Sequence, residues 1–506
     1  MATPTHNGIP IVLTADRTLM AHYPTLLDGM MATIQTSGVP AVVMRRLLAP
    51  PMPHPGGRAA RAPLGLRRIE AALRRDGFDP RAIAIVSPER LDEVVGPRTR
   101  IVGLSSGDPL GRGMTNTTMV AMSGGRLYTR TWFADACARL RRLRDGGLDF
   151  HVVAGGPGAW QLANAPATAD ARGIDHVFLG YAERDVADLF GRLMDGEVLD
   201  PVLVGRRTAP GDIPPIEGPT GMGVVEISRG CGRGCGFCTL AGEPMVHLGA
   251  ERIVADVAAN VRGGCPSISL ISEDLLRYGS DGTTVDPPAL LDMLAAVRGV
   301  QGVRMIQVDH VNIASVEQFS DEQLRQVRRL LRAGSAHEQV WVNLGAESAA
   351  GDLLTANGLG GKIRPFDASD WPRLCENAAR RLAGCGFVPM LSLILGLPGE
   401  TGAHVEQTID LVRRLEGLRA VIFPIFHAPL APGCRPFGLD DMTASHWRLF
   451  RLAYRFNFRW IPGLFADNHR AAGAPWWRRL FVQAAGRIQK RQWQLKFIRR
   501  SGRLRP

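Results

Sequence analysis

The sequence predicts an α/β protein in three parts: a doubly wound, Rossmann-like sheet domain, a partial (β/α)6 barrel and a small helical C-terminal region. Three observations predict it. Short apolar runs alternate with helix-length segments; the alternation stops at a Pro- and Gly-rich stretch and restarts after it; and residues 441–506 look helical. Strands that alternate with helices form parallel sheets, because each crossover helix returns the chain to the same edge.

Residues 1–205 carry five candidate strands, each an apolar run of the length expected for a strand buried on both faces. These runs begin at Ile9, Ala82, Arg100, Asp149 and Asp175. Helical segments lie between them, for example after Leu66 and after Asp135. We therefore predict a doubly wound parallel sheet, a fold that binds ligands beyond the carboxyl ends of its strands.

A linker is predicted at residues 206–220, which are rich in Pro and Gly. Beyond it, six further candidate strands begin at Gly223, Ser267, Val303, Gln339, Val388 and Ala420. Six strand–helix units predict a partial barrel over residues 221–440, with functional groups at the C-terminal ends of the strands. Residues 441–506 then form either a third small domain or a cap.

Composition excludes fibrous, disordered and membrane-spanning classes. Hydrophobic residues make up 45% of the chain, and no apolar run approaches the roughly 18 residues that a membrane span needs. The N-terminus lacks the pattern of a secretory signal, so we expect a cytoplasmic protein. The net charge of +12 comes mostly from arginines spread along the chain, which is typical of a solvated basic surface.

The segment from Trp476 to the C-terminus is denser in charge, with ten Lys or Arg residues and no acidic residue. Its basic residues alternate with apolar ones, including Trp477, Leu480 and Phe497. Such a mixture can lie on an anionic membrane surface, which would suit a lipid-like substrate. The alternative is a basic helix packed on the barrel.

Three cysteines form the clearest motif in the chain. Cys231, Cys235 and Cys238 have the spacing C-x3-C-x2-C in a glycine-rich loop that follows the first predicted barrel strand. Three thiolates on one loop can bind three irons of a [4Fe–4S] cube and leave the fourth iron open. Phe237, between the last two cysteines, would shield the cluster edge from water. The alternatives are a cluster with a fourth protein ligand, or a zinc site completed by His247 or Cys265.

The other five cysteines are scattered, and we interpret them as small buried hydrophobic residues. They are Cys137, Cys265, Cys375, Cys385 and Cys434.

The cysteine motif, with an aromatic residue before its last cysteine, resembles that of the radical S-adenosylmethionine (SAM) superfamily. The resemblance covers roughly residues 223–439. It implies a [4Fe–4S] cluster, bound SAM and an external electron donor such as flavodoxin or ferredoxin. It further implies reductive cleavage of SAM to methionine and a 5′-deoxyadenosyl radical, which abstracts hydrogen from an unreactive carbon.

Further positions match this family less sharply. Ser272 and Glu273 lie where the family has residues that contact the SAM amino group, although Ser-Glu-Asp also suits a helix N-cap. Glu347 and Ser348 resemble a Glu-Ser pair near the SAM ribose or carboxylate; the alternative is a solvated loop. Gly396 belongs to a Gly-Leu-Pro-Gly-Glu-Thr turn that would approach the adenosine or serve only as a tight turn.

Asp309 and His310 end the third predicted barrel strand and are expected at the mouth of the barrel. They are our candidates for a substrate-binding or acid–base role. The alternative for His310 is a hydrogen bond that serves structure alone.

The N-terminal half resembles, over residues 60–195, the cobalamin-binding domain found ahead of many radical SAM barrels. The matching positions at its strand ends are Ser105, Ser106, Gly155, Gly156, Gly180 and Glu183. Small residues there would let the backbone approach a nucleotide tail. The Asp-x-His-x-x-Gly signature that supplies a histidine to cobalt is absent, so cobalt would be bound without histidine. The insert at residues 108–118 would contact the corrin or form an ordered turn. A vestigial sheet that binds no cobalamin is the alternative.

The leading hypothesis is therefore a cobalamin-dependent radical SAM methyltransferase acting on a small-molecule or lipid-like substrate, without nucleic acid. A non-methylating radical SAM enzyme is the second hypothesis, and an iron–sulfur sensor or scaffold is the third. A tRNA methylthiotransferase would require three further cysteines in the N-terminal domain and a C-terminal β-barrel. The N-terminal half contains only Cys137, and the tail looks helical.

Overall fold

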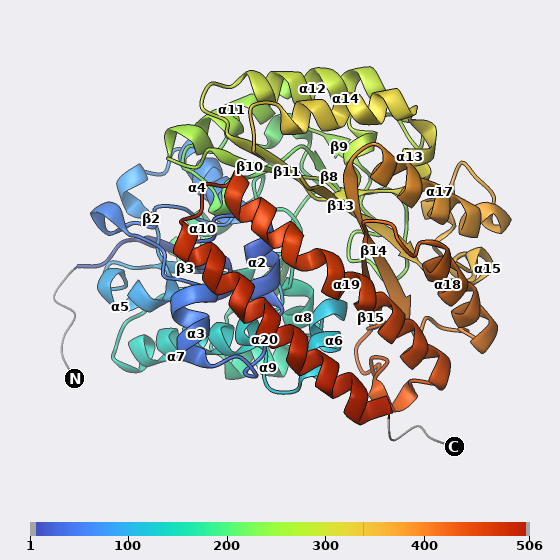
Figure 1. The fold of residues 1–506 in the computed structure, drawn as a ribbon. Coiled ribbons are helices and arrows are strands. Elements are labelled where there is room, and N and C mark those ends of the chain that lie inside the picture. Colours follow the sequence, from blue (N-terminus) through green and yellow to red (C-terminus); the bar gives the residue numbers. More distant parts are fainter. Residues whose placement is uncertain (1–6, 337, 502–506) are drawn as a thin grey trace. The chain divides into compact units, whose positions relative to one another are not determined.

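The computed structural model describes residues 7–336 and 338–501, with the side chains of residues 496–501 left out (Figure 1). Lys496 and Phe497 of the predicted tail therefore lie outside the described side chains. The chain forms two compact units. The first comprises residues 1–225 and 255–265, and the second comprises residues 226–254 and 266–506.

The first unit contains a six-stranded sheet in the order β2-β1-β3-β4-β5-β6, and every pair in it is parallel. The strands are β1 (Ile11–Ala15), β2 (Ile83–Ile85), β3 (Ile101–Ser105), β4 (His151–Gly155), β5 (His176–Leu179) and β6 (Val202–Val204). Strand order reverses at β1, which defines a doubly wound sheet whose ligand-binding edge lies at the carboxyl ends of β1 and β3. The predicted fold of this half is confirmed, and β6 is an additional edge strand.

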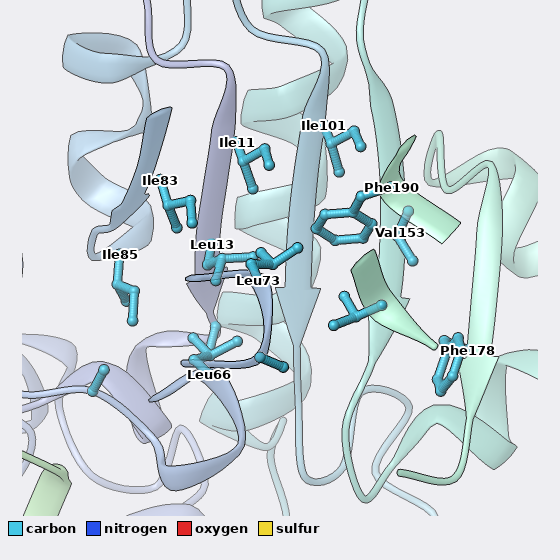
Figure 2. Close-up of a cluster of buried hydrophobic side chains, with 14 of the residues drawn as sticks. Ile11, Leu13, Leu66, Leu73, Ile83, Ile85, Ile101, Val153, Phe178 and Phe190 are labelled. Atoms are coloured by element: carbon cyan, nitrogen blue, oxygen red, sulfur yellow. The ribbon is translucent and has the colours of Figure 1, made fainter. Parts of the chain in front are cut away.

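Helices surround this sheet. They are α1 (Arg17–Met20), α2 (Leu26–Thr33), α3 (Ala41–Val43), α4 (Leu64–Arg75), α5 (Leu91–Val94), α6 (Met114–Ser123), α7 (Tyr128–Asp145), α8 (Ala159–Ala163), α9 (Pro166–Ala171) and α10 (Val186–Met194). Successive strand residues point to opposite faces. Ile11 and Leu13 pack with Leu73 of α4 and Phe190 of α10 in one core cluster (Figure 2), whereas Val12 packs in the cluster that contains α7. Each such buried side chain contributes about 1.5–3 kcal/mol.

The barrel strands follow in sequential order; the first of them ends at the first residue of the second unit, and the others belong to that unit. They are β7 (Val224–Glu226), β10 (Ser267–Ile271), β11 (Met305–Val308), β12 (His310–Val311), β13 (Val340–Glu347), β14 (Phe387–Leu395) and β15 (Val421–Phe426). One sheet has the order β11-β10-β7 and a second has the order β12-β13-β14-β15. Asp309 alone separates β11 from β12, so the third predicted strand crosses from one sheet to the other. All six predicted strands are present, as is the α/β architecture.

The helices of this unit alternate with the strands. They are α11 (Ala250–Arg262), which crosses into the first unit, α12 (Pro287–Gly299), α13 (Ile313–Gln318), α14 (Asp321–Arg332), α15 (Gly351–Ala356), α16 (Gly360–Ile363), α17 (Trp371–Gly384) and α18 (Gly402–Arg414). Capping boxes begin two of them, at Ser320 for α14 and at Thr401 for α18. No α-helix begins at Ser272–Asp274; a 3-10 turn, Leu275–Arg277, follows instead, and Asp274 makes no capping bond to it.

Two helices complete the chain: α19 (Ala444–Ala471) and α20 (Trp476–Ser501). The helical prediction for this region is confirmed. Asn457 of α19 accepts from the backbone N–H of Ile422 and donates to its carbonyl, at 2.9 and 2.8 Å. Asn468 Oδ1 accepts from Gln307 Nε2 at 2.6 Å and from Trp341 Nε1 at 3.2 Å. These bonds join α19 to three barrel strands. Within the described part of the chain, no helix is long and apolar enough to cross a membrane.

Candidate active site at the ends of the barrel strands

The three-cysteine loop is held by a short antiparallel pair, β8 (Ser228–Arg229) and β9 (Val246–His247). Inside the loop, the N–H groups of Cys231 and Gly232 both donate to the carbonyl of Glu243, at 3.1 and 2.8 Å. Gly230 has a φ of 73°, and a Cβ there would overlap the carbonyl of Pro244. Only glycine combines this backbone conformation with such a close approach. The glycines therefore fold the loop tightly around its cysteines.

The three thiols share one electrostatic environment. Burial raises the pKa of all three, and that of Cys235 reaches about 11. The charges of Cys231 and Cys238 contribute to the rise at Cys235, whereas the ammonium of Lys362 opposes it. The backbone N–H of Leu240 donates to Cys238 Sγ at 3.4 Å. The thiols are thus close enough to influence one another, and Phe237 lies half-buried between Cys235 and Cys238.

No group of three or more His, Cys, Asp or Glu side chains among the described residues is arranged to hold a metal ion. The predicted zinc alternative, with His247 or Cys265 as a further ligand, gains no support from local contacts. His247 Nε2 lies 3.1 Å from the carbonyl of Ser280, and Cys265 is buried at the end of the segment after α11.

Arg233, between the first two cysteines, joins the loop to three other parts of the unit: the end of β10, α13 and α16. Its Nη2 donates to Asp274 Oδ2 and to Ser315 Oγ, both at 3.0 Å. Its Nη1 donates to the carbonyls of Gly361 at 3.1 Å and Lys362 at 3.3 Å. This arginine was not predicted as a functional residue, although its place inside the motif was a signal that could have identified it.

Of the three residues after β10, two are buried and one is exposed. Asp274 is fully buried and accepts from Arg233, from Ser315 Oγ at 2.6 Å and from the N–H of Asn312 at 3.1 Å. Ser272 is buried, and its hydroxyl contacts that of Ser228. Glu273 is exposed, yet the surrounding protein desolvates it and raises its pKa; the charge of Asp309 adds to the rise. Glu273 is therefore the carboxylate at this strand end that remains accessible to a ligand.

Asp309 and His310 follow β11 and carry opposite charges. Asp309 Oδ1 accepts from Asn343 Nδ2 at 2.6 Å, and its Oδ2 lies 3.0 Å from His310 Nδ1. That nitrogen is buried and makes no hydrogen bond of good geometry. Burial disfavours the charged imidazole, but the carboxylates of Asp309 and Glu273 outweigh it and raise the pKa of His310 to about 9. With 43% of its side chain exposed, His310 is an accessible imidazolium at neutral pH.

Glu347 ends β13 in an unusual backbone conformation. Its φ is 60°, and the pairing of β13 with β14 is irregular between Gly345 and Glu347. A non-glycine residue in this region costs about 1–3 kcal/mol, which marks a position held by its surroundings. Oε1 accepts from Lys362 Nζ at 2.6 Å, and Oε2 accepts from Ser392 Oγ at 3.1 Å. Neither partner was predicted from the sequence.

The other two predicted residues of this unit make internal contacts. Ser348 is buried; its hydroxyl lies 3.3 Å from Thr408 Oγ1 and accepts from the N–H of Ala350 at 3.2 Å. Gly396 has a φ of 80°, and its N–H donates to Glu400 Oε2 at 2.7 Å. A Cβ on Gly396 would overlap the ring of Phe437. Both residues therefore shape the turns at the ends of β13 and β14, and their SAM contacts remain predictions.

The predicted residues of the first unit gather at the carboxyl ends of its strands. Gly156, with a φ of 91°, lies against Ser105 and Ser106, and a Cβ on it would overlap Ser105 Oγ. Gly155 leaves more room, because a Cβ there would meet only the carbonyl of Phe178, at 3.8 Å. A role for these residues in binding cobalamin remains a prediction.

The remaining predicted residues are placed less centrally. Gly180 follows β5, where the nearest atom to an added Cβ is the carbonyl oxygen of Gly205, at 3.8 Å. Glu183 is buried, and its carbonyl accepts from Arg75 Nη2 of α4 at 2.9 Å. In the insert at residues 108–118, Asp108 accepts from Gln161 Nε2 at 2.6 Å and from the N–H of Arg112 at 2.8 Å. The insert thus forms an ordered turn that leads into α6.

Sequence reasoning missed Asp16, which follows β1 at the point where the strand order reverses. It is fully buried and accepts from Ser106 Oγ at 2.7 Å and from the N–H of Thr18 at 2.9 Å. Burial raises its pKa to about 6, although these hydrogen bonds oppose the rise. The position of Asp16 directly after a strand of the predicted doubly wound sheet could have identified it as a candidate functional residue.

The chain resembles several characterised proteins in sequence. It is 29% identical over 268 residues to the ribosomal protein uS12 methylthiotransferase RimO of Sorangium cellulosum, covering 49% of each chain. It is 25% identical over 217 residues to the threonylcarbamoyladenosine tRNA methylthiotransferase MtaB of Thermotoga maritima, covering 42% of this chain and 46% of that protein. The chain spans about half the length of the curated relatives it matches.

Two solved structures share the fold. Both are of TsrM from Kitasatospora setae, a radical S-adenosylmethionine methyltransferase, one with cobalamin and a [4Fe-4S] cluster bound and one with tryptophan and a SAM analogue. The TM-scores are 0.53 and 0.51, with 14% sequence identity; the likeness covers 84% and 83% of this chain and 74% and 75% of those chains. Residues 225–412 match the family model of the Radical SAM superfamily. The three-cysteine loop and the strands from β10 to β14 therefore lie in a part of this chain, residues 225–412, that is a radical SAM domain.

Proposed function

We propose that this protein is a cobalamin-dependent radical SAM enzyme that transfers a methyl group to an unreactive carbon of its substrate. The observation that carries the proposal is the glycine-rich loop, which presents Cys231, Cys235 and Cys238 beside acidic side chains at the strand ends. The fold shared with TsrM supports the extension to cobalamin and methyl transfer, because TsrM is described with both.

The donor set fits a [4Fe–4S] cluster, although the three sulfurs are not already grouped as metal ligands in this structure. Three thiols lie on one loop whose glycines leave little room for other side chains. Charged groups near the loop raise or lower the pKa of each thiol. A coordinating thiol is deprotonated by the metal, so binding of the cluster must offset the raised pKa values of the three free thiols. Cys231, Cys235 and Cys238 would hold three irons, and the N–H of Leu240 would remain a hydrogen-bond donor to the sulfur of Cys238.

When bound, the cluster and SAM supply the radical chemistry, and this chain positions and shields them. Glu273 is accessible and presents a carboxylate suited to the SAM amino group. Glu347 is fixed by Lys362 and Ser392, so it offers a rigid acceptor for a ribose hydroxyl. The imidazolium of His310 holds a proton at Nε2 or Nδ1 beside Asp309, where it can donate to a substrate group.

The first unit suits a nucleotide-like ligand because its sheet has small residues at the carboxyl ends of β3, β4 and β5. Ser105 and Gly155 border the edge at which a doubly wound sheet of this strand order binds its ligand. Gly156 packs tightly on Ser105, so the fold itself requires a glycine there, whether or not cobalamin binds. Gly155, whose surroundings are open, is therefore the better probe of cobalamin binding.

The sequence relatives favour a second candidate function, methylthio transfer, because those proteins are methylthiotransferases. Residues 1–225 of this chain contain a single cysteine, Cys137, and it is buried. Burial raises the pKa of that thiol to about 12, which makes it a poor metal ligand. The chain therefore lacks the additional N-terminal cysteines expected of that class.

The test is anaerobic reconstitution followed by analysis of iron, cobalamin and SAM products. We expect about four irons per chain, bound cobalamin, 5′-deoxyadenosine formation and a product heavier by one methyl group. Replacing Cys231, Cys235 or Cys238 by Ala should abolish the iron chromophore and SAM cleavage, whereas Cys385→Ala should retain both. SAM cleavage without cobalamin binding would favour a non-methylating enzyme, and sulfur in the product would favour methylthio transfer.

We propose two partners in addition to the small-molecule or lipid-like substrate. An external electron donor such as flavodoxin or ferredoxin must supply the electron that reduces the cluster. An anionic lipid surface is the second, because α20 presents an exposed apolar and basic face. Trp476, Leu480 and Ile488 of that face are 66%, 58% and 60% exposed. No role is proposed for nucleic acid.

A further inference from the structure

Lys362 is one of the few lysines in a chain whose basic residues are almost all arginines. Of the 60 Lys and Arg residues, only three are lysines, and the other two, Lys490 and Lys496, lie near the C-terminus. Lys362 is also buried, with 11% of its side chain exposed. Lysine is rarely buried without a specific partner, because its ammonium loses hydration there. Its position in α16 therefore requires a physical reason.

The structure holds the ammonium of Lys362 in a fixed place. Nζ donates to Glu347 Oε1 at 2.6 Å. Gly345 provides the space, since a Cβ there would overlap both Lys362 Nζ and Glu347 Oε1. Lys362 has the slim stem and compact charge that this space admits, whereas arginine would bring a planar guanidinium.

The same short helix is attached to the cysteine loop. Arg233 donates to the carbonyls of Gly361 and Lys362, and a Cβ on Gly361 would overlap the carbonyl of Arg233. The backbones of the loop and of α16 are therefore in direct contact between Cys231 and Cys235. This contact brings a buried positive charge next to the loop that presents the thiols.

The charges of Lys362 and of its partner act on the thiols in opposite directions. The ammonium of Lys362 favours the thiolate at Cys235 and at Cys238, whereas Glu347 disfavours it at Cys235. Burial alone would lower the pKa of Lys362, but Glu347 and Cys235 outweigh it and raise that pKa, so the ammonium stays charged. On the other side, Glu273 disfavours the thiolates at Cys231 and Cys238.

We propose that Lys362 is a positioning residue that raises the reduction potential of the cluster held by Cys231, Cys235 and Cys238. The inference rests on the proposed function, because it requires the cluster to bind at these cysteines. Reduction adds one electron to the cube, and a fixed positive charge in a poorly hydrated environment stabilises the more negative state. Lys362 thus makes the cluster easier to reduce by the external donor, without contacting substrate.

The experiment is a potentiometric titration of the reconstituted protein with dithionite as the electron source, followed by the EPR signal of the reduced cluster. Lys362→Met retains the length of the side chain and removes the charge, so the midpoint potential should shift to a more negative value. Glu273→Gln is the matched control of opposite sign, since it removes an exposed negative charge from the other side of the loop. Its midpoint potential should shift to a more positive value.

The outcomes separate the two proposals. If the unchanged protein binds no iron, the proposed function fails. If it binds the cluster and Lys362→Met leaves the midpoint unchanged, only the role of Lys362 is overturned. Shifts of both variants in the same direction would also overturn it, because they would report disturbance of the loop and not charge. If Lys362→Met loses iron, Lys362→Gln takes its place, because the amide still donates a hydrogen bond to Glu347 but carries no charge. A midpoint potential unchanged in that variant overturns the role.

Discussion

Arg233 and Asp274 form a buried ion pair, with 3.0 Å between Nη2 and Oδ2, that joins the cysteine loop to the end of β10. Their side chains are 3% and 0% exposed. Ser315 contacts both partners, so the two charges belong to one hydrogen-bonded network. The cysteine motif and the second barrel strand are thereby held in one arrangement.

Breaking this pair should destabilise the second unit and loosen the loop. Arg233→Met leaves the carboxylate of Asp274 buried without its charged partner, a change that typically costs about 3–5 kcal/mol. We expect a lower free energy of unfolding in denaturant titrations and a lower iron content after reconstitution. Arg329→Met is the matched control, because the Arg329–Glu322 pair is about 60% exposed and should contribute at most about 1 kcal/mol. Equal losses in the two variants would contradict the assigned role of Arg233.

The sequence was sufficient to predict the barrel strands because each contains a largely buried apolar run, and helix-length segments separate most of these runs. It did not predict β6, since this edge strand has three residues and Val204 is 74% exposed, so no buried pattern marks it. The third barrel strand was predicted to end at Asp309 and His310. The chain instead continues as β12, where His310 pairs with Asn343 in the other sheet.

The candidate site was predictable only where its residues are close in sequence. The three cysteines form a local motif, whereas Arg233 and Gly361 are 128 residues apart and meet only in the folded chain. Ser106 and Asp16 are separated by 90 residues and are joined by the pairing of β1 with β3. Lys362 is one of only three lysines in the chain, but its contact with Glu347 and the space left by Gly345 exist only in the folded protein.

The charge of His310 should depend on pH in the alkaline range. Its pKa is raised from 6.5 to about 9, so its ion pair with Asp309 is fully present below pH 6.5 and is lost as the pH rises through 9. If His310 donates a proton to the substrate, the rate of product formation should fall over the same range. Asp309→Asn removes the nearest carboxylate and should move both the pKa of His310, followed by NMR of labelled histidine, and the fall in rate to lower pH. A profile unchanged by this substitution would argue against the assignment.

The ends of β3 and β4 should be the place where the first unit binds cobalamin. The Cβ added by Gly155→Leu would meet the protein only at 3.8 Å, so this substitution should disturb the sheet less than the same substitution at Gly156. A nucleotide tail at this edge would be obstructed, and the variant should retain much less hydroxocobalamin than the unchanged protein while keeping its iron. Gly156→Leu should lose cobalamin as well, but with a measurable loss of stability, because its side chain would overlap Ser105. Full retention of cobalamin by Gly155→Leu would place the ligand elsewhere.

The last prediction concerns the exposed face of α20. At 3.6 residues per turn, Trp476, Trp477, Leu480, Ile488 and Leu495 fall within an arc of about 120°, together with Arg487 and Arg491. The opposite side of the helix packs on α19, where the ring of Trp493 stacks on that of Tyr454 with 5.1 Å between the ring centroids. A face of this kind gains from burial of its apolar side chains and about 1 kcal/mol from each basic residue near an anionic lipid surface.

We therefore expect the protein to co-sediment with vesicles that contain phosphatidylglycerol and to remain in solution with vesicles of phosphatidylcholine alone. Changing Trp476, Trp477 and Leu480 to Ser should reduce sedimentation, because these side chains contribute most of the apolar area at the start of the helix. The packing of Trp493 on Tyr454 is untouched by these changes, so thermal stability should be retained. Raising the salt concentration should weaken binding as well, since the arginine contribution is screened within about 10 Å at 0.1 M salt. Sedimentation that is the same after truncation at Gly473 would refute this role of α20.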